Sequence, residues 1–418
     1  MASTYLTRTF GSGNRKKFTW SGWVKRSAIT YQNITGVYTS SSNYCNFQFS
    51  NGKLRVFDNG NVNVETNAQL RDPNAWYHIV FRIDTTHGTE ANRVRIYVNG
   101  VQETSLAAAT YPSHNFDFNY NTNTLHGLGA RSDGDSKFDG SMSHVHFLDG
   151  EDRDASYFGE TDSTTGEWKI KTDVTGVTYG TNGYFILKDG NSVTDQSGNS
   201  NNFTVAGGTL TKTEDNPSNV FATLNPLDNI GSSSFSNGNL QIDTGNSNYT
   251  YNNSTLGYTS GKYYWEAKIT HTSNYDHIGI TSKGSTGTTQ YMYASDYNYT
   301  LKSDNGVLKY KAGGSTTDVS GWSGASFGVG NIISIAHDVD NNKIYFAKDG
   351  VWMNSANPNT PTGGITTTSL SSTDTGVWLP AFGDENNGTY TTWQVNFGNG
   401  YFGTTAVSSA GTNASGNG

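Results

Sequence analysis

The fold class is decided by two stretches: residues 76–84 read WYHIVFRID and residues 94–100 read VRIYVNG. The first is a run of aromatic and β-branched residues, which predicts a β-strand with both faces partly buried. The second alternates in character and ends in Asn-Gly, a pair that favours a tight hairpin turn. Both patterns are typical of short β-strands joined by turns.

Similar patterns recur on both sides of these stretches. Residues 18–25 alternate large and small or polar side chains, and residues 143–150 form a further strand that ends in Asp-Gly. A second set of predicted strands lies later, at residues 261–270, 332–338, 343–350, 377–382 and 392–398. No stretch of about ten residues has a convincing helical period, and residues 102–110 are expected to form a short helical turn or a loop. The sequence therefore predicts an all-β protein.

The composition agrees with this fold class and limits the function. Of 418 residues, 9 are Trp, 25 are Tyr, 20 are Phe and 49 are Gly, which excludes wholesale disorder. The formal net charge of −8 argues against sequence-independent DNA binding. No apolar run reaches the ~18 residues of a membrane span. From the charge we therefore expect no nucleic-acid binding, and from the lack of such a run no membrane insertion. Cys45 is the one cysteine, which excludes an internal disulfide, and we expect it to be a buried thiol in a strand.

Two sets of motifs resemble known β-sandwich families. Residues 23–25, 76–80, 93–100 and 138–145 follow one another in the order of concanavalin A-like LamG jelly rolls. A second set resembles a SPRY domain, at residues 261–266, 278–280, 335–338, 343–346, 349–352 and 395–398. The resemblance implies two antiparallel β-sandwich domains, an N-terminal LamG-like jelly roll and a C-terminal SPRY-like domain, joined by a small β connector.

The motif positions divide the chain into five parts. We expect an N-terminal arm at 1–17, the LamG-like domain at 18–159, the connector at 160–230, the SPRY-like domain at 231–403 and a flexible tail at 404–418. Pro217 and Pro226 mark a linker before the second domain. The tail is rich in Ser, Gly, Ala and Asn, a composition that favours flexibility.

The whole chain also resembles virion structural proteins of tailed phages, especially marine ones. The motifs that carry this resemblance lie at residues 5–10, 14–26, 195–203 and 221–228. It implies a non-enzymatic tail fibre or head appendage, assembled in the host cytoplasm and located in the virion as a homo-oligomer or in many copies. The implied partners are other virion proteins, through the N-terminal part, and a host-surface glycan or receptor, through the SPRY-like domain. A capsid-decorating protein that binds only virion partners is the alternative.

Aromatic residues near turns are the candidates for ligand binding, because aromatic faces stack on sugars and anchor protein partners. The candidates are Tyr291, Tyr293, Tyr297, Tyr299 and Trp322. The tyrosines stand at alternate spacing within each pair, so cross-strand packing is their alternative role. Trp322 lies in a Gly/Ser-rich loop, and Tyr249, Tyr251 and Tyr258 form another aromatic group.

The N-terminal segment contains the densest basic stretch, which makes it the candidate for docking on an acidic virion surface. The candidate residues are Tyr5, Arg8, Phe10, Arg15, Lys16 and Lys17. A solvated turn before the first strand is the alternative interpretation of the basic residues.

Patterns for catalysis are absent or incomplete. Some jelly rolls of this class are glycosidases whose carboxylates occupy alternate strand positions. The nearest approach is Glu160, Asp162 and Glu167, which are too widely spaced and have the composition of a turn. We therefore expect no catalytic residues and no enzymatic activity, with a polysaccharide-degrading enzyme as a further alternative.

Metal-binding patterns are similarly incomplete. Asp133, Asp135 and Asp139 are candidate calcium ligands, although Asp-Gly pairs by themselves favour turns. His144 and His146 are two residues apart, so on a regular strand they share a face, and we expect a satisfied pair rather than a zinc site. No resident cofactor is expected, and a calcium ion at the three aspartates is the alternative.

Overall fold

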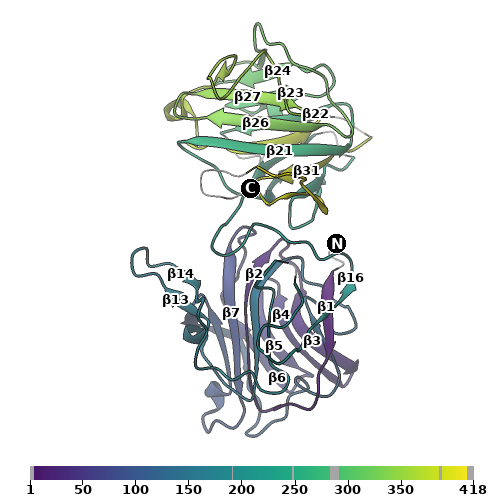
Figure 1. Cartoon of the computed structure of the whole chain (residues 1–418), viewed down its shortest axis with the longest axis vertical. Helices are drawn as coiled ribbons and strands as arrows, with labels where there is room; N and C mark the ends of the chain where they lie inside the picture. The colour runs from purple at the N-terminus through teal and green to yellow at the C-terminus, as the bar shows by residue number, and fades with distance from the viewer. Residues whose placement is uncertain (1–3, 191, 247–248, 283–290, 386–387, 412–418) are drawn as a thin grey trace. The chain divides into compact units, whose positions relative to one another are not determined.

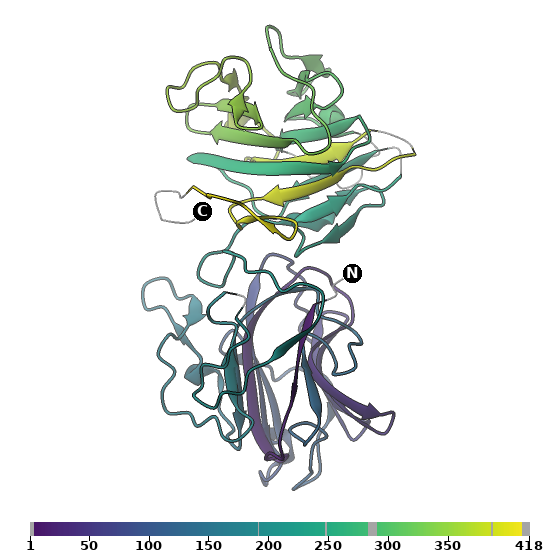
Figure 2. The same ribbon diagram turned by 45° about the vertical axis from the view of Figure 1, so that its right-hand side comes forward.

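Antiparallel β-strands make up most of the regular structure in the computed structural model, which describes residues 4–190, 192–246, 249–282, 291–385 and 388–411. Within these ranges there is no α-helix, and hence none long and apolar enough to cross a membrane. The chain divides into two units, Met1–Val220 and Phe221–Gly418. Each unit contains two large sheets that lie as layers (Figures 1 and 2), which confirms the predicted all-β class with two sandwiches.

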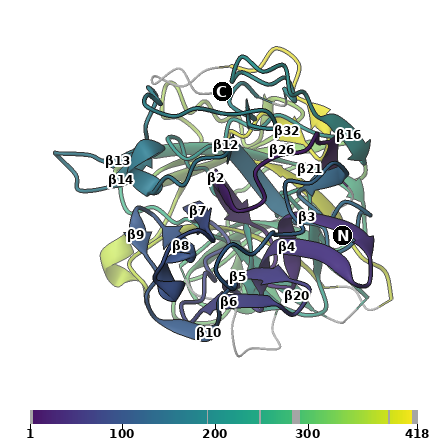
Figure 3. The same cartoon turned by 90° about the horizontal axis from the view of Figure 1, so that it is seen from below.

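The first unit is built on two sheets, here named sheets I and II, whose strands lie in separate layers in Figure 3. In order of hydrogen-bonded neighbours, sheet I contains β10 (Leu106–Thr110), β6 (Val62–Thr66), β5 (Lys53–Asp58), β4 (Asn43–Ser50), β3 (Gln32–Ser40), β11 (Leu125–Leu128), β1 (Tyr5–Thr9) and β16 (Thr204–Gly207). Sheet II contains β15 (Tyr184–Ile186), β12 (Gly140–Asp149), β2 (Lys17–Arg26), β7 (Trp76–Asp84), β8 (Val94–Val98) and β9 (Val101–Gln102).

Alternating apolar side chains fill the space between sheets I and II, because successive strand residues point to opposite faces. In β2, the inward residues Phe18, Trp20 and Val24 are fully buried. Phe18 packs edge-on against Phe47 of β4, with ring centroids 6.2 Å apart. The predicted strand at 76–84 coincides with β7. These contacts join the two sheets into one core.

A further layer covers the outer face of sheet II, and it comes from the segment that the sequence assigned to the connector. Strands β13 (Gly159–Thr161) and β14 (Trp168–Ile170) form a hairpin, while β15 and β16 extend sheets II and I. Residues 155–179 pack Phe158 and Tyr179 against the outward side chains of Val80 and Leu148. Strand β2 is therefore buried on both faces.

The second unit has the corresponding pair, sheets III and IV. Sheet III contains β17 (Leu224–Ile230), β20 (Thr250–Ser254), β30 (Leu379–Asp384), β22 (Asp276–Thr281), β23 (Asn298–Lys302), β24 (Leu308–Lys311) and β25 (Thr317–Asp318). Sheet IV contains β18 (Ser234–Ser236), β19 (Gln241–Asp243), β31 (Thr392–Asn396), β21 (Lys262–His271), β26 (Ile332–Asp338), β27 (Lys343–Lys348) and β28 (Val351–Trp352), and β29 (Ile365–Thr366) also pairs with β27. Strands β32 (Tyr401–Phe402) and β33 (Thr405–Ala406) form a hairpin.

The core of the second unit again consists of inward aromatic and β-branched residues. Trp393 of β31 packs against Phe382 of β30 with centroids 5.8 Å apart, which joins sheets III and IV. In β22, the fully buried Ile278 and Ile280 belong to this core. Because side chains alternate along a strand, His277 lies on the opposite, outer face of sheet III.

Several local expectations need correction or find support. Residues 102–110 contain strands β9 and β10 instead of a helical turn. Part of the predicted N-terminal arm is strand β1, between β11 and β16. Cys45 is a buried thiol in β4, as predicted. The predicted tail contains β33, and its residues 412–418 lie outside the described residues. The 3-10 helices are η1 (Glu90–Asn92), η2 (Ala155–Tyr157), η3 (Met292–Ala294) and η4 (Leu370–Ser372).

Candidate functional site

Three tyrosine rings gather on the outer face of sheet III. Tyr249 meets Tyr291 edge-on with centroids 4.5 Å apart, and Tyr291 stacks on Tyr293 at 4.7 Å. The two stacked rings flank Met292, which is fully buried against Tyr251. Burial of Met292 anchors helix η3 to the sheet and leaves the neighbouring tyrosines partly exposed. This arrangement presents aromatic faces on an anchored element.

A carboxylate and a lysine hold Tyr293 in place. The Tyr293 hydroxyl donates to Oε2 of Glu385 at 2.5 Å, and Nζ of Lys302 donates to Oε1 at 2.7 Å. Burial opposes ionisation of Glu385, but these two hydrogen bonds outweigh it and hold the pKa of Glu385 below its usual value. Burial and the neighbouring carboxylate raise the pKa of Tyr293. Glu385 is therefore an anion and Tyr293 a neutral donor at ordinary pH.

His277 of β22 lies beneath this group. Its side chain is fully buried, its ring meets Tyr293 edge-on at 5.0 Å, and its Nε2 lies 3.7 Å from Oε2 of Glu385. Neither ring nitrogen has a hydrogen-bond partner among the described residues. Burial lowers the pKa of His277 to about 3, so the ring is neutral at ordinary pH. A neutral, inaccessible imidazole is unsuited to general acid–base chemistry.

More aromatic side chains stand on the loops at the same end of the sheets. Asp276 and Asp384 are register partners at this end, so the loops before β22 and after β30 meet here. Tyr275 and Tyr390 are 43% and 38% exposed, and the Tyr390 ring stacks on His271 at 4.1 Å. We name Tyr249, Tyr275, Tyr291, Tyr293 and Tyr390 together the tyrosine end.

The structure separates the five aromatic residues that the sequence proposed as ligand-binding. Tyr291 and Tyr293 belong to the tyrosine end. Tyr299 is only 4% exposed and packs within the core, and Tyr297 is a partly buried residue against the same core. Trp322 donates to the Gly306 carbonyl oxygen at 2.8 Å and packs edge-on against Phe346. The last three side chains therefore contribute packing.

Sequence reasoning missed His277, Lys302 and Glu385. They come from β22, the end of β23 and the residue after β30, which are far apart in the chain. Alternation with the inward residues Ile278 and Leu301 could have placed His277 and Lys302 on the outer face. Nothing local marks Glu385, because its role depends on the pairing of β22 with β30.

The N-terminal docking candidates mostly serve the first unit itself. Phe10 is 1% exposed and stacks on His126 at 3.7 Å, and Arg8 lies over the Phe10 ring and bonds to Asn201. Tyr5 pairs with Gly207 in sheet I and Lys17 forms an ion pair with Asp152 at 3.0 Å. Lys16 is partly exposed, with its backbone N–H bonded to Asn14. Phe10 cannot reach a partner's surface without opening the core.

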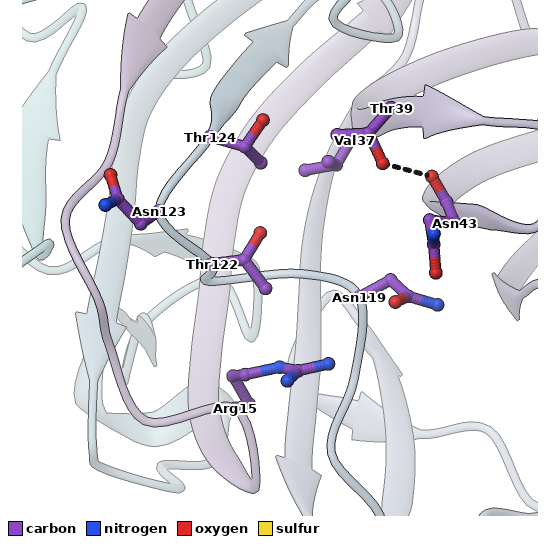
Figure 4. A pocket seen from close by; sticks show the side chains of 8 residues that line it. All are labelled: Arg15, Val37, Thr39, Asn43, Asn119, Thr122, Asn123 and Thr124. Carbon is purple, nitrogen blue, oxygen red and sulfur yellow. Dashed lines mark hydrogen bonds between the residues drawn. The ribbon is translucent and has the colours of Figure 1, made fainter.

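Arg15 lines a hollow of about 310 Å³ in the first unit (Figure 4). The other lining residues are Val37 and Thr39 of β3, Asn43 of β4, and Asn119, Thr122, Asn123 and Thr124 of the loop before β11. The Arg15 guanidinium donates from Nε to the Phe118 carbonyl oxygen at 2.6 Å. Arg15 thus holds this loop in place, beside amides and hydroxyls that remain near the surface.

The candidate calcium ligands are engaged by a neighbouring cation. Arg131 forms ion pairs with Asp133 at 2.7 Å and with Asp135 at 3.3 Å. Burial raises the pKa of Asp139. Among the described residues no cluster of three or more His, Cys, Asp or Glu side chains is suited to a metal ion. Asp133 and Asp135 thus stabilise their own loop through Arg131.

The two histidines of β12 lie at a register shift in the ladder to β2, between Ser143 and His146, and both rings contact Phe185. His144 adopts a left-handed backbone with φ 47°, and its Nδ1 contacts the Ser143 hydroxyl. His146 instead contacts the Tyr179 hydroxyl at 2.9 Å and stacks on Phe185. Each histidine thus has a hydroxyl partner of its own, as expected for a satisfied pair.

The carboxylates of the β13–β14 hairpin lack the arrangement of a glycosidase. Lys169 pairs with Asp162 at 3.1 Å and with Glu160 at 3.6 Å. Backbone hydrogen bonds from Thr165 and Thr164 lower the pKa of Asp162. A retaining or inverting glycosidase needs an acid whose pKa is raised, facing a second carboxyl across a cleft.

A buried Ser–His pair on sheet II also lacks the geometry for nucleophilic catalysis. His78 contacts the Ser21 hydroxyl through Nε2 at 2.9 Å and accepts from Trp168 Nε1 at its Nδ1 at 3.0 Å. Since Nδ1 accepts, the proton of the neutral ring is on Nε2, which then donates to Ser21. Histidine in this tautomer cannot remove the serine proton.

Comparison with known proteins gives a family match for part of the chain. Residues 2–155 match the family model described as the concanavalin A-like lectin/glucanases superfamily. No curated protein matches the sequence. Similar solved structures include the SPRY domain of human HERC1, with 17% identity, 41% of this chain and 96% of that chain covered, and a TM-score of 0.31.

Two other solved structures are similar at lower identity. A human SPRY domain has 12% identity, coverage of 37% of this chain and 89% of that chain, and a TM-score of 0.27. The TRIM65 PSpry domain has 10% identity, coverage of 42% and 88%, and a TM-score of 0.30. The family match is thus confined to the first unit: over residues 2–155 the chain is similar to the concanavalin A-like lectins and glucanases.

Proposed function

We propose that the protein is a non-enzymatic adhesion protein of a phage particle, whose second unit binds a host-surface glycan through the tyrosine end. The observation that carries this proposal is the Tyr249–Tyr291–Tyr293 group, held by Glu385 and Lys302. Sugars bind to aromatic faces, and rings that are already ordered lose little entropy on binding. Asp304 and Asn305, exposed in the loop after β23, offer polar groups for sugar hydroxyls nearby.

The virion location rests on the motif resemblance along the chain. In this proposal the first unit attaches to other virion proteins, with Arg15, Lys16 and the polar hollow of Figure 4 as the surface nearest the N-terminal basic stretch. Several copies on one particle would convert weak single-site contacts into avidity. The arrangement of the carboxylates and of Ser21–His78 supports a binding role over hydrolysis.

The test is binding of fluorescently labelled full-length protein to host cells, with Tyr291→Ala and Tyr293→Ala as variants. Each variant is expected to weaken binding about tenfold or more, as for aromatic anchors of interfaces. The matched control is Tyr264→Ala, which removes a 55% exposed tyrosine from β21 of the same unit. Equal losses for Tyr264→Ala, or unchanged binding by the two variants, would remove the tyrosine end from the proposal.

Immunogold electron microscopy of intact particles, with antibody to residues 240–400, tests the location. Label at tail or fibre tips supports host adhesion. Uniform label over the head supports the capsid-decorating alternative, in which the second unit need not contact the host. Particles without label would contradict a virion protein altogether.

A further inference from the structure

A lysine and an aspartate meet in a buried site on the outer face of sheet II. Nζ of Lys25, on β2, lies 2.5 Å from Oδ2 of Asp215, and the two side chains are only 4% and 8% exposed. The residues are 190 positions apart in the chain. Lys25 stands in the middle of the sheet, paired with Trp76 of β7 on one side and Ser141 of β12 on the other. The amine and the carboxyl are thus fixed by separate, ordered elements.

The surroundings of Asp215 favour attack on its carboxyl carbon. Nε1 of Trp76 donates to Oδ1 of Asp215 at 3.0 Å, while the lysine nitrogen lies against Oδ2. A donor on Oδ1 stabilises the negative charge that develops there when a nucleophile adds to the carbon. Oδ2 lies beside the Lys25 nitrogen, from which it can take a proton. One oxygen is therefore polarised and the other is placed to leave.

Burial also favours the neutral amine of Lys25. Desolvation lowers the pKa of Lys25, although the nearby Asp215 charge raises it in part. A desolvated lysine amine is an activated nucleophile. Because both side chains are buried, transfer of one proton from the ammonium to the carboxylate replaces two buried charges with a neutral pair.

We propose that Lys25 and Asp215 are joined by an intramolecular isopeptide bond. The Lys25 ammonium gives one proton to Oδ2, and the resulting amine adds to the Asp215 carboxyl carbon. A second proton passes from nitrogen to Oδ2, the bond between that oxygen and the carbon breaks, and one water leaves. The products are a neutral amide and water, and neither an oxidant nor a reductant is needed.

Other lysine–carboxylate pairs of the chain differ in ways that predict no reaction. Lys17 and Asp152 are 34% and 17% exposed, so both ions remain solvated. Lys302 and Glu385 are 2.7 Å apart and 9% and 13% exposed, so this pair is both more widely spaced and more exposed than Lys25 and Asp215. We therefore expect one cross-link in the chain.

The cross-link would close a loop that includes nearly the whole first unit. Since Cys45 is the one cysteine, the chain cannot form a disulfide for this purpose. A covalent loop of this length restricts the unfolded chain strongly, by the same argument that applies to disulfides.

The test is the intact mass of the purified full-length protein under denaturing conditions, followed by peptide mapping. We expect a mass one water below the calculated value and a branched tryptic peptide that joins Lys25 to Asp215. Lys25→Arg and Asp215→Ala are expected to restore the full calculated mass. A full-mass wild-type protein would overturn the proposal, and this outcome does not depend on whether either variant folds.

Two controls separate the cross-link from other reactions. Aspartate in Asp-Gly sequences can also lose water by forming a succinimide, but that loss would persist in Lys25→Arg and give no branched peptide. Lys17→Arg is the matched control, since it alters a neighbouring lysine of the same strand that has an aspartate partner. It is expected to retain the deficit of one water, and a full-mass Lys17→Arg protein would also contradict the proposal.

Discussion

The outer faces of sheets II and III each contain a buried histidine and a lysine–carboxylate pair, but different parts of the chain cover these side chains. Each has a buried histidine, His78 or His277, whose pKa burial lowers to about 3. Each also has a lysine–carboxylate pair, Lys25–Asp215 or Lys302–Glu385. On sheet II the unit's own chain, including Trp168, covers these groups. On sheet III the cover is Tyr293 with its partly exposed tyrosine neighbours.

The hydrogen bonding of the two histidines shows what the difference means. His78 has a partner at each ring nitrogen, Ser21 and Trp168, as is usual for buried polar groups. His277 has none among the described residues. His78 is thus satisfied by the chain that covers it and serves stability, whereas the partly exposed rings of the tyrosine end are the better candidate for an external ligand. Similar side chains therefore take different roles according to what covers them.

The largest expected difference between the units is their response to acid. Burial lowers the pKa of His78 and His126 to about 3 and that of His144 to about 4, and it lowers the pKa of His146 further. Their unfolded-state pKa is about 6.5, so the unfolded chain binds more protons below that pH. Stability is therefore unaffected above pH ~6.5 and falls as the pH drops towards 3, by up to about 1.4 kcal/mol per pH unit for each histidine.

In the second unit, among the described residues, only His277 and His337 have lowered histidine pKa values. We therefore expect acidification from pH 7 to about 5 to destabilise the first unit more steeply than the second. Hydrogen exchange followed on peptides from each unit measures this. His78→Gln should reduce the slope for the first unit alone, and equal slopes in both units would contradict the assignment.

The next largest expected effect is the loss of stability when Trp168, which covers the outer face of sheet II, is replaced. Trp168 donates to His78 and packs so closely on Gly100 and Gly159 that a Cβ at either position would lie within 2.6 Å of the indole. Trp168→Ala is expected to lower the free energy of unfolding of the first unit by about 2–4 kcal/mol. Urea denaturation measures it. Trp168→Phe, which retains a ring but loses the N–H donor, should cost about 1 kcal/mol.

On the outer face of sheet III, removal of an aromatic ring should cost the second unit much less stability. The Tyr291 ring is partly exposed and contacts Tyr249 and Tyr293, but it is not part of a core cluster. Tyr291→Ala is expected to lower the free energy of unfolding of the second unit by less than about 1 kcal/mol. The same denaturation experiment applies. A loss as large as that for Trp168→Ala would show that Tyr291 is structural, and the comparison of the two faces would fail.

The sequence predicts the strands of both units well, for a local reason. Alternation and turn residues specify β7, β26 and β27 from adjacent residues alone. Prediction from the sequence fails where a strand pairs with residues that are far away in the chain. It missed that β1 lies between β11 and β16 and that residues 155–179 cover sheet II. A segment of turn-rich composition gives no local sign of the surface that it covers.

The site was predictable only in part, for the same reason. The run from Tyr291 to Tyr299 marks an aromatic region, but not which rings are inward. Helix η3 and the left-handed backbone of Tyr297, with φ 55°, break the alternation, so that Tyr293 lies outside and Tyr299 inside. Glu385 becomes visible only when β22 and β30 are paired.

The smallest expected effect concerns calcium, and it extends the comparison to the surface carboxylates. Arg131 forms ion pairs with Asp133 and Asp135 in the first unit, as Lys302 does with Glu385 in the second. An ion that binds there must displace a hydrogen-bonded guanidinium, so added calcium should shift the melting temperature by less than about 1 °C. Arg131→Ala frees both carboxylates, and the same thermal scan should then show a larger shift with calcium than with potassium at equal ionic strength. A clear rise of the melting temperature of the wild-type protein with calcium would instead mean that calcium displaces Arg131. Asp133, Asp135 and Asp139 would then again be candidate calcium ligands. The two results separate a loop that is held by its own cation from one that is prepared for an external cation.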